Sequence, residues 1–121
     1  MKTLKVGIAT YDEMKARTLA IAKGDLKPKA ADPKVWFTST ESFAKVLSDR
    51  NRSLLAVIAD TQPESLSALA MATGRTAGNL SRTLRTMERY GLVRRYKGAR
   101  GSVRPEVPYR DVRLELSLAH R

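Results

Sequence analysis

The segment 79–93, NLSRTLRTMERYGLV, constrains the fold more than any other part of the chain. At about 100° per residue, its apolar residues fall in one narrow arc of a helix and its arginines fall in the opposite arc. Gly91 follows the last turn, where a left-handed residue commonly closes a helix. The pattern predicts a helix over 76–90 that begins at the cap Thr76 and has one core face and one open face. The core face is expected to hold Leu80, Leu84 and Met87.

The open face of this helix suits a DNA major groove. Arginine forks onto guanine, asparagine pairs with adenine, and glycine lets two backbones approach closely. A solvated amphipathic helix on the protein surface is the alternative that this segment alone leaves open. The candidate DNA-binding residues in the helix and the turn before it are Arg75, Thr76, Gly78, Asn79, Ser81, Arg82, Arg85, Thr86 and Arg89.

The charge of the chain is concentrated in the same region. The whole chain carries 23 Lys and Arg against 12 Asp and Glu, a formal net charge of +11. Residues 75–121 hold 12 basic and 4 acidic residues, net +8, whereas residues 41–74 hold 3 and 4, net −1. All of the basic residues in 75–121 except Lys97 are arginines, the side chain that binds phosphate and guanine through two parallel hydrogen bonds. This local excess indicates a polyanionic partner, most simply a nucleic acid.

Several classes of protein are disfavoured. The chain has no cysteine, which excludes disulfides and thiolate metal sites, and its one histidine, His120, is close to the C-terminus and a poor ligand or base. No apolar run approaches the roughly 20 residues that span a bilayer, and acidic residues come too early for a signal peptide. A glycine-rich phosphate loop and a pair of catalytic carboxylates are also missing. We therefore expect neither an enzyme, nor a cofactor, nor a metal site.

The N-terminal third predicts a separate extension. Alternating apolar residues predict a strand at Leu4–Ile8, and Asp12 is the expected cap of the helix that follows and ends at Gly24. The segment 23–34 contains two prolines and no apolar period, which is typical of a linker. We expect residues 1–34 to form a strand-helix extension and linker for dimerisation or partner binding. Residues 35–121 should then form the DNA-binding domain.

A second helix precedes the arginine-bearing one. It is expected to begin at the cap Ser65 and to end at Gly74, so that only Gly74 and Arg75 separate it from Thr76. Two short helices joined by a tight glycine turn, the second one basic, form a helix-turn-helix.

The chain after this helix has the texture of strands and turns. Extended segments flank the glycine-bracketed turn 97–101, which predicts a hairpin over 93–104 that ends at Pro105. In a winged helix, the hairpin that directly follows the helix in contact with the DNA bases is called the wing. Such a wing would bind phosphates or the minor groove. Alternation then predicts a strand over Val112–Leu118. The expected fold class is α+β, mainly α: a winged helix-turn-helix with an N-terminal strand-helix extension and a C-terminal strand. The candidate DNA-binding residues of the wing are Lys97, Arg100 and Arg104.

The segment 65–93 resembles the helix-turn-helix of MarR-type and related ArsR-type winged-helix regulators. The shared features are Leu69-Ala70, the turn glycine Gly74, Leu-Ser-Arg at 80–82 and Gly-Leu-Val at 91–93. The resemblance covers about a quarter of the chain and implies DNA contacts by Thr76, Asn79, Ser81 and Arg82. The usual Asp-Arg wing signature is replaced by KGARGSVRP, and the long terminal dimerisation helices are missing. These departures put the placement of the wing, the mode of dimerisation and any effector pocket in doubt.

The order of segments also resembles a small group of prokaryotic winged-helix proteins with starts like GIATYDEMKARTLAIAKG and PKVWFTS. Some members of that group resemble antitoxins paired with TumE-type toxins. This resemblance implies a cytoplasmic bacterial or archaeal protein with a possible toxin partner.

These observations predict a sequence-specific DNA-binding transcriptional regulator, a repressor, that reads the major groove of double-stranded DNA with helix 76–90 and uses the wing 93–104. It is expected to be a homodimer built by the segments outside the winged helix, with its two reading helices on a palindromic site. An antitoxin that neutralises a toxin and represses its own operon is the alternative. An RNA-binding domain is a third interpretation, but exposed aromatics interleaved with arginine on a strand are missing.

Overall fold

The computed structural model describes residues 2–118. His120, which we expect to be a poor ligand or base, lies outside the described residues. The chain divides into two compact units. We call residues 46–110, together with residue 2, the helical unit, and residues 3–45 with the chain from 111 onward the sheet unit. The division differs from the predicted boundary at residue 34, because residues 35–37 and the C-terminal strand belong to a sheet with the N-terminal strand.

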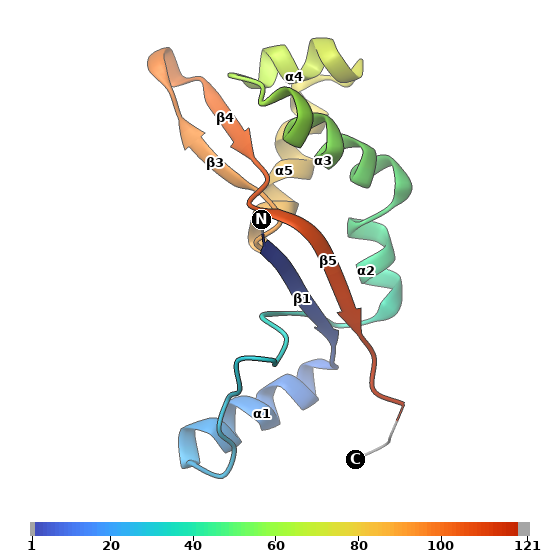
Figure 1. The fold of residues 1–121 in the computed structure, drawn as a ribbon, viewed down its shortest axis with the longest axis vertical. Coiled ribbons are helices and arrows are strands. Elements are labelled where there is room, and N and C mark those ends of the chain that lie inside the picture. Colours follow the sequence, from blue (N-terminus) through green and yellow to red (C-terminus); the bar gives the residue numbers. More distant parts are fainter. Residues whose placement is uncertain (1, 119–121) are drawn as a thin grey trace. The chain divides into compact units, whose positions relative to one another are not determined.

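The described chain is an α+β structure with five α-helices and five strands, and helices outweigh strands as expected (Figure 1). The predicted class is therefore confirmed at this level. The helical unit contains α3 (Asp49–Thr61), α4 (Leu66–Thr73), α5 (Ala77–Arg89), β3 (Arg94–Lys97), the 3₁₀ turn η1 (Ala99–Gly101) and β4 (Val103–Glu106). The sheet unit is built from β1 (Lys2–Ile8), α1 (Tyr11–Lys23), β2 (Val35–Phe37), α2 (Thr40–Val46) and β5 (Tyr109–Glu115).

Hydroxyl caps and left-handed residues set the ends of the helices in the helical unit. The side chains of Ser48, Ser65 and Thr76 each accept a hydrogen bond from a backbone N–H in the first turn of α3, α4 and α5, respectively. Gly74 ends α4 with φ +72°, a conformation that glycine adopts without steric cost. The short connection from Gly74 to Thr76 follows directly from these two signals. The sequence predicts the end of α4 at Gly74 and the start of α5 at Thr76, and both are observed there.

The core of the helical unit lies between α3, α4 and α5. Leu54 and Ile58 of α3, Leu69 of α4 and three residues of α5 are almost completely buried. The three residues of α5 are those predicted for its core face, Leu80, Leu84 and Met87.

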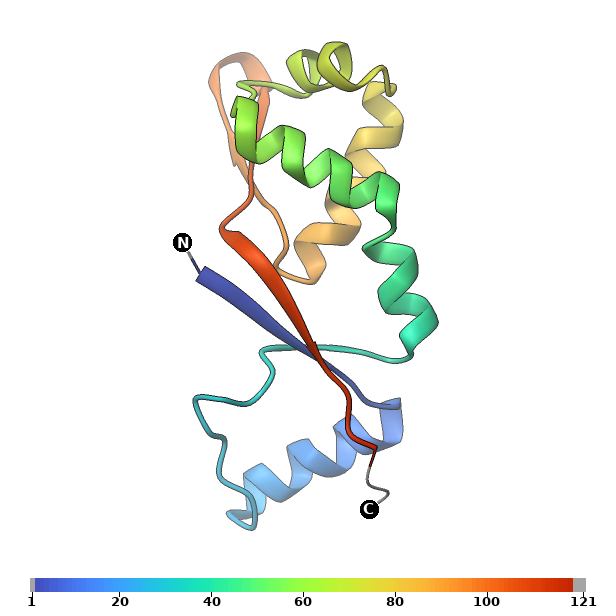
Figure 2. The same cartoon turned by 45° about the vertical axis from the view of Figure 1, so that its right-hand side comes forward.

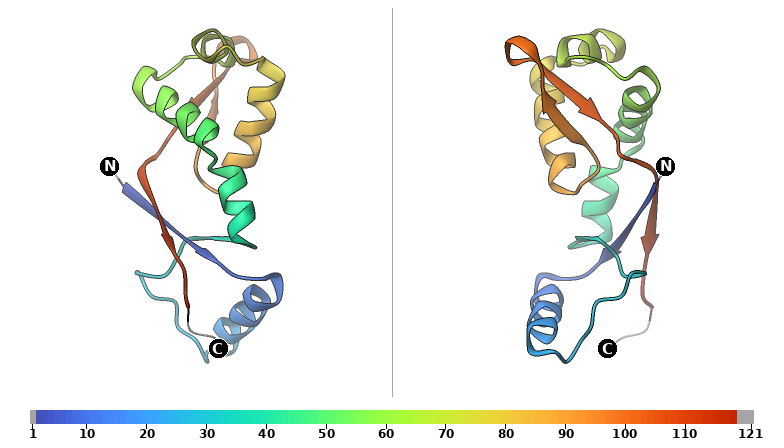
Figure 3. Two further views of the ribbon diagram at one scale, coloured as in Figure 1. Left: turned by 90° about the vertical axis from the view of Figure 1, so that its right-hand side faces the viewer. Right: turned by 60° about the vertical axis from the view of Figure 1, so that its left-hand side comes forward.

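The two-stranded hairpin of β3 and β4 completes the helical unit. The strands are antiparallel, with Arg94 opposite Glu106 and Lys97 opposite Val103. In Figures 1 and 3 the tip of the hairpin lies at the same end of this unit as α4 and the N-terminal end of α5. Pro105 was expected to end the hairpin, but it lies inside β4 and is buried. A two-stranded ribbon tolerates this proline because each strand has one open edge, where a backbone N–H is not needed.

The sheet unit holds a three-stranded sheet in the order β2-β1-β5. β1 and β2 are parallel, with Val6 opposite Val35 and Ile8 opposite Phe37. β5 is the neighbour of β1 on its other edge, and the arrows of the two strands point the same way (Figures 1 and 2). The N-terminal strand therefore has a neighbour on both of its edges within one chain.

The two sides of β1 are covered differently. Trp36 lies so close to Gly7 that a Cβ atom there would come within 2.6 Å of the indole ring, which explains the glycine. Arg17 of α1 stacks on the same indole at 5.6 Å. Phe37, which is fully buried, meets Phe43 of α2 edge to face, with ring centroids 5.2 Å apart.

Two predicted boundaries in the sheet unit are wrong. Thr10, and not Asp12, caps α1: its hydroxyl accepts from the Glu13 N–H, and the Glu13 carboxylate accepts in return from the Thr10 N–H. This reciprocal capping box is the more stable start. The C-terminal strand ends at Glu115 rather than at Leu118, which is 97% exposed. Alternation of apolar residues continues beyond the strand, but the last of them are not covered.

Candidate nucleic-acid interface

The outward face of α5 carries three exposed arginines. Arg82, Arg85 and Arg89 are exposed along the helix, and Gly78 leaves the backbone of the first turn open, with nothing within 4 Å of a Cβ atom built there. The opposite face is the buried stripe of the core. Burial of that stripe fixes the rotation of the helix, so the arginines cannot turn inward without exposing it. The predicted two-faced helix is thus the one observed.

The polar residues beside the arginines are half-buried and hydrogen-bonded along the helix. The Thr86 hydroxyl donates to the Arg82 carbonyl oxygen at 3.2 Å and accepts from Arg89 Nη2 at 3.4 Å. Ser81 is also half-buried. Thr76, which was assigned to DNA, is exposed, and its hydroxyl caps the helix by accepting from the Asn79 N–H at 3.1 Å.

Arg75 lies back against α5 instead of extending outward with the other arginines. Its Nε donates to Asn79 Oδ1 at 2.8 Å and its Nη2 donates to Thr83 Oγ1 at 3.3 Å, whereas its Nη1 is buried without a partner. Burial, and then the charge of Arg50, lowers the pKa of Arg75 from its usual value. The prediction grouped Arg75 and Asn79 with the exposed residues, but the two side chains hold each other at the start of α5.

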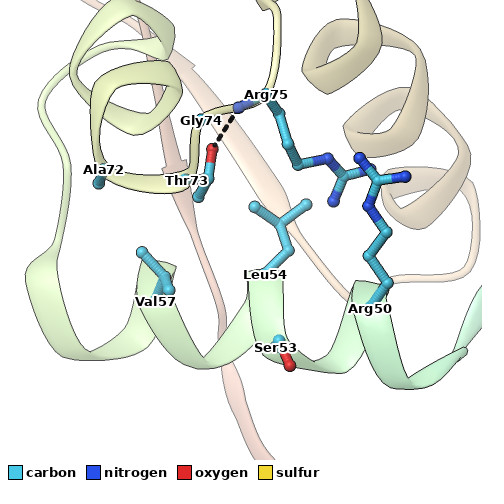
Figure 4. A pocket seen from close by; sticks show the side chains of 8 residues that line it. All are labelled: Arg50, Ser53, Leu54, Val57, Ala72, Thr73, Gly74 and Arg75. Carbon is cyan, nitrogen blue, oxygen red and sulfur yellow. Dashed lines mark hydrogen bonds between the residues drawn. The ribbon is translucent and has the colours of Figure 1, made fainter.

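A hollow of about 350 Å³ opens beside Arg75, between α3 and the α4–α5 connection. Figure 4 shows the guanidinium groups of Arg50 and Arg75 side by side above Leu54, with the apolar side chains of Val57 and Ala72 at the other end (Figure 4). The residues that line it all belong to the helical unit. Arg50 was not predicted as a site residue, because its distance of 25 positions from Arg75 gives no local pattern in the sequence.

The tip of the hairpin carries Lys97 and Arg100, which are both exposed as predicted. Arg100 has φ +59°, in the left-handed region, within a turn that the Gly98 N–H closes by donating to the Ser102 carbonyl oxygen at 2.7 Å. The turn is tight, since a Cβ atom on Gly98 would lie 2.6 Å from Ser102 Oγ. The closing hydrogen bond of this tight turn holds Arg100 in its left-handed conformation.

Arg104 lies on the outer face of the hairpin. Its guanidinium stacks on Tyr96 at 4.7 Å from the ring centroid and lies 3.6 Å from the Glu106 carboxylate. On the same face, Arg94 is exposed and forms no hydrogen bond or ion pair with the described residues. Arg94 was missed, although it follows the buried pair Leu92–Val93 and an alternating strand would place it outward.

One ion pair joins α5 to the hairpin. Arg95 of β3 donates to Glu88 Oε1 through Nη2 at 2.7 Å and through Nε at 3.1 Å. These hydrogen bonds lower the pKa of Glu88 and raise that of Arg95. The hairpin is therefore attached to the helix by two charge-assisted hydrogen bonds to one carboxylate oxygen, on the side away from Arg94 and Arg104.

Comparison with known protein families identifies the helical unit as the shared part. Residues 46–114 match the HVO_A0114 family, and this match spans more than half of the chain. The chain belongs to the HVO_A0114 family. The region that matches HVO_A0114 contains α3, α4, α5, the hairpin and most of β5, so it includes every candidate DNA-binding residue named above. No curated protein and no solved structure matches the chain.

Within residues 2–118, no three His, Cys, Asp or Glu residues are grouped so that they can hold a metal ion. No helix within the same range has the length and apolar character needed to cross a membrane.

Proposed function

We propose that this chain is a winged helix-turn-helix regulator that binds double-stranded DNA and represses transcription. In this proposal α4 and α5 form the helix-turn-helix, α5 enters the major groove, and the β3–β4 hairpin is the wing. The observation that carries the proposal is the arrangement of α5, in which three exposed arginines lie opposite a fully buried stripe. A helix fixed in rotation by its core presents base-reading groups at defined positions.

The hairpin supports the same interface. Its tip, with Lys97 and Arg100, lies at the end of the helical unit where α5 begins. A recognition helix contacts base edges mainly through its N-terminal residues, and a wing beside it reaches phosphates or the minor groove. The cations of the hairpin tip thus lie near the N-terminal part of α5 in one compact unit.

Asn79 has a more restricted role than an exposed asparagine. Its Oδ1 is occupied by Arg75 Nε, which leaves its amide N–H groups as the free donors. Adenine recognition by asparagine uses both a donor and an acceptor. Asn79 is half-buried and Arg75 already uses one lone pair of its Oδ1, so the exposed Arg82 and Arg85 are the better candidates for reading bases.

The test is to select binding sites from random duplex DNA and then to measure the affinity of variants for the selected site. Arg82→Ala should weaken specific binding by about 1–3 kcal/mol and change binding to random DNA little. Arg52→Ala is the matched control, because Arg52 is an exposed arginine of the same unit that pairs with Asp49 outside α5 and the hairpin. Failure to enrich any sequence, or equal affinity of Arg82→Ala and the parent, would refute the proposal.

We also infer a homodimer, paired through β5, which is one of the segments outside the winged helix. β1 has both edges occupied within the chain, whereas β5 lies at the end of the sheet. An unpaired strand edge is a template for pairing with a second copy. If two β5 strands pair antiparallel about Val112, Asp111 of each copy lies opposite Arg113 of the other. Each copy then brings one α5 to a palindromic site.

Charge exchange tests this dimer. Asp111→Arg should favour the monomer, because each pair becomes Arg opposite Arg. The double variant with Asp111→Arg and Arg113→Asp restores opposite charges and should restore the dimer. The masses of the free proteins can be measured by light scattering at several concentrations. A monomeric parent, or equal dissociation of both variants, would contradict pairing through β5.

A toxin partner is the second candidate function, and α1 is the observation that favours it. None of its 13 residues is buried, and it exposes Tyr11 and Leu19 by 71% and 50%. An exposed apolar helix face is a common docking surface. If the neighbouring gene encodes a small toxin, the two proteins should copurify after coexpression. Leu19→Lys should abolish that complex and leave DNA binding unchanged, and an unaffected complex would exclude this face.

A further inference from the structure

The hollow beside Arg75 brings together two cations without an anion. The guanidinium groups of Arg50 and Arg75 lie side by side at its mouth. Among the described residues, no carboxylate forms an ion pair with either group. Two adjacent like charges repel, and the direction of the Arg75 pKa change reflects this repulsion together with burial. An anion between the two groups would relieve it.

The hydrogen bonds of Arg75 point to the same conclusion. Nε and Nη2 have partners on α5, but Nη1 is buried and has none. Buried polar groups in native proteins are nearly always hydrogen-bonded, so an orphan donor calls for a missing acceptor. Arg50 likewise forms no hydrogen bond or ion pair with the described residues. The two guanidinium groups thus bring unpartnered donors from α3 and from the α4–α5 connection together beside the hollow, with Nη1 of Arg75 covered from solvent.

We propose that this hollow binds a tetrahedral oxyanion of the phosphate type, held between Arg50 and Arg75. Guanidinium groups bind phosphate oxygens through strong, directional, charge-assisted hydrogen bonds. The remaining lining at Leu54, Val57 and Ala72 is apolar and leaves room for the carbon part of a phosphate ester. With a volume of about 350 Å³ the hollow is large enough for such a group, and its mouth is open.

An occupied hollow would act on the proposed reading helix through Arg75. The orphan Nη1 of Arg75 is the donor left for the anion, and Nε of the same guanidinium holds Asn79 Oδ1, so an anion that fixes Arg75 also fixes Asn79 at the start of α5. This consequence rests on the proposed DNA-binding function, whereas oxyanion binding itself does not. The phosphate has two possible sources, the backbone of bound DNA and a free phosphate ester, and the chemistry of recognition is the same for both.

Titration of the full-length protein with inorganic phosphate, at constant ionic strength against chloride, tests the site. The arginine Nε–H signals are followed by NMR. The Arg75 signal should shift in a saturable way, and the signal of exposed Arg89 should not. Arg50→Gln should raise the apparent dissociation constant about tenfold or more, since it removes one charged donor. Arg52→Gln is the matched control, because Arg52 is an exposed arginine of the same helix α3 that pairs with Asp49, and it should leave the constant unchanged.

The variant Arg50→Gln keeps the test interpretable because Arg50 is exposed and has no partner to lose. An unchanged backbone amide spectrum of the variant confirms that it folds. Three outcomes would overturn the proposal: no saturable shift of Arg75, a shift of Arg75 equal to that of Arg89, or an affinity for phosphate that Arg50→Gln leaves unaltered.

Repeating the titration on the complex with the selected DNA distinguishes the two sources. If a backbone phosphate fills the hollow, DNA abolishes the response to phosphate and Arg50→Gln lowers the salt dependence of DNA binding by about one contact. If the ligand is a free ester, the response persists in the complex and Arg50→Gln leaves DNA affinity unchanged. Saturable phosphate binding by a protein that selects no DNA would refute the proposed function alone. Selective DNA binding without any phosphate response would refute this inference alone.

Discussion

The helices α1 and α5 have the same length and the same kind of start, yet only one of them is part of a core. Each has 13 residues and is capped by a threonine, Thr10 or Thr76. α5 buries three large apolar residues, whereas α1 buries none. The difference is in spacing: Leu80, Leu84 and Met87 recur at helical intervals in one narrow arc, whereas the larger apolar residues of α1 are scattered over a broader and exposed side of the helix. Capping starts a helix, but apolar periodicity decides whether it is anchored.

The exposed faces of the two helices differ as well. The open face of α5 carries arginines and no carboxylate among its fully exposed residues, whereas exposed positions of α1 include Asp12, Glu13 and Lys15. A face with only positive charge attracts a polyanion, whereas a face that carries both signs does not. We therefore expect changes in α5 to affect stability and DNA binding, and matched changes in α1 to affect neither of them strongly.

The largest expected effect is on stability. Leu84→Ala should lower the free energy of unfolding by about 2–5 kcal/mol, because Leu84 is completely buried between α5 and its neighbours. Leu19→Ala in α1 is the control and should change it by less than about 0.5 kcal/mol, because half of that side chain is already in water. Chemical denaturation of both variants measures the contrast. Similar losses would mean that α1 is anchored as firmly as α5.

The next effect concerns salt. If about six phosphates are contacted, DNA affinity should fall on the order of a thousandfold between about 50 and 200 mM salt. Arg89→Gln should reduce the logarithmic salt slope by about one. Lys15→Gln in α1 should leave the slope unchanged. Fluorescence anisotropy with labelled duplex at several salt concentrations gives the slopes, and a flat dependence in the parent would remove the arginine face from the interface.

A smaller effect is expected at the two caps. Thr76→Ala should cost about 1 kcal/mol, since it removes the acceptor for the Asn79 N–H. It should also weaken DNA binding, because the first turn of α5 carries the proposed reading residues. Thr10→Ala removes the corresponding acceptor of α1 and should leave DNA binding unchanged. Chemical denaturation combined with DNA titration tests this pair, and loss of DNA binding in Thr10→Ala would contradict the separation of roles.

The comparison also explains what the sequence could predict. The boundaries of α4 and α5, the buried stripe and the hairpin are local, because each depends on residues within a few positions of one another. A glycine at 74, a threonine at 76 and apolar residues at helical spacing are readable without knowing the fold. The exposed arginines of α5 were found for the same reason.

The features that the sequence did not predict depend on contacts between distant segments. The fold of Arg75 onto Asn79 and Thr83 depends on the exact turn geometry, and the neighbourhood of Arg50 depends on how α3 packs against the turn. The pairing of β1 with β5 is a further contact of this kind, since the two strands are separated by about 100 positions in the sequence. Apolar alternation identifies strands, but it does not say which strands will pair.

The smallest expected effect is on the pH dependence of stability. Among the described residues, each unit has one carboxylate whose pKa is lowered. In the helical unit, the Arg95 guanidinium lowers the pKa of Glu88 through its hydrogen bonds. In the sheet unit, a hydrogen bond from the Lys29 backbone N–H is the largest cause for Asp32, and the charge of Arg17 adds to it.

A carboxylate with a lowered pKa stabilises the folded state above its unfolded pKa, and this contribution is lost as the pH falls through the folded value. Glu88→Gln should therefore reduce stability at pH 7 by a few tenths of a kcal/mol, since the pair with Arg95 is partly exposed. The difference between parent and variant should disappear as the pH falls below about 4, the range in which glutamate becomes protonated. Asp32→Asn is the counterpart in the other unit, and its effect should disappear at lower pH because an aspartate titrates below a glutamate. Thermal melts of the parent and both variants between pH 2 and 7 separate the two contributions. If the Glu88→Gln difference persisted at pH 2, the stabilisation would come from packing of the side chain and not from its charge.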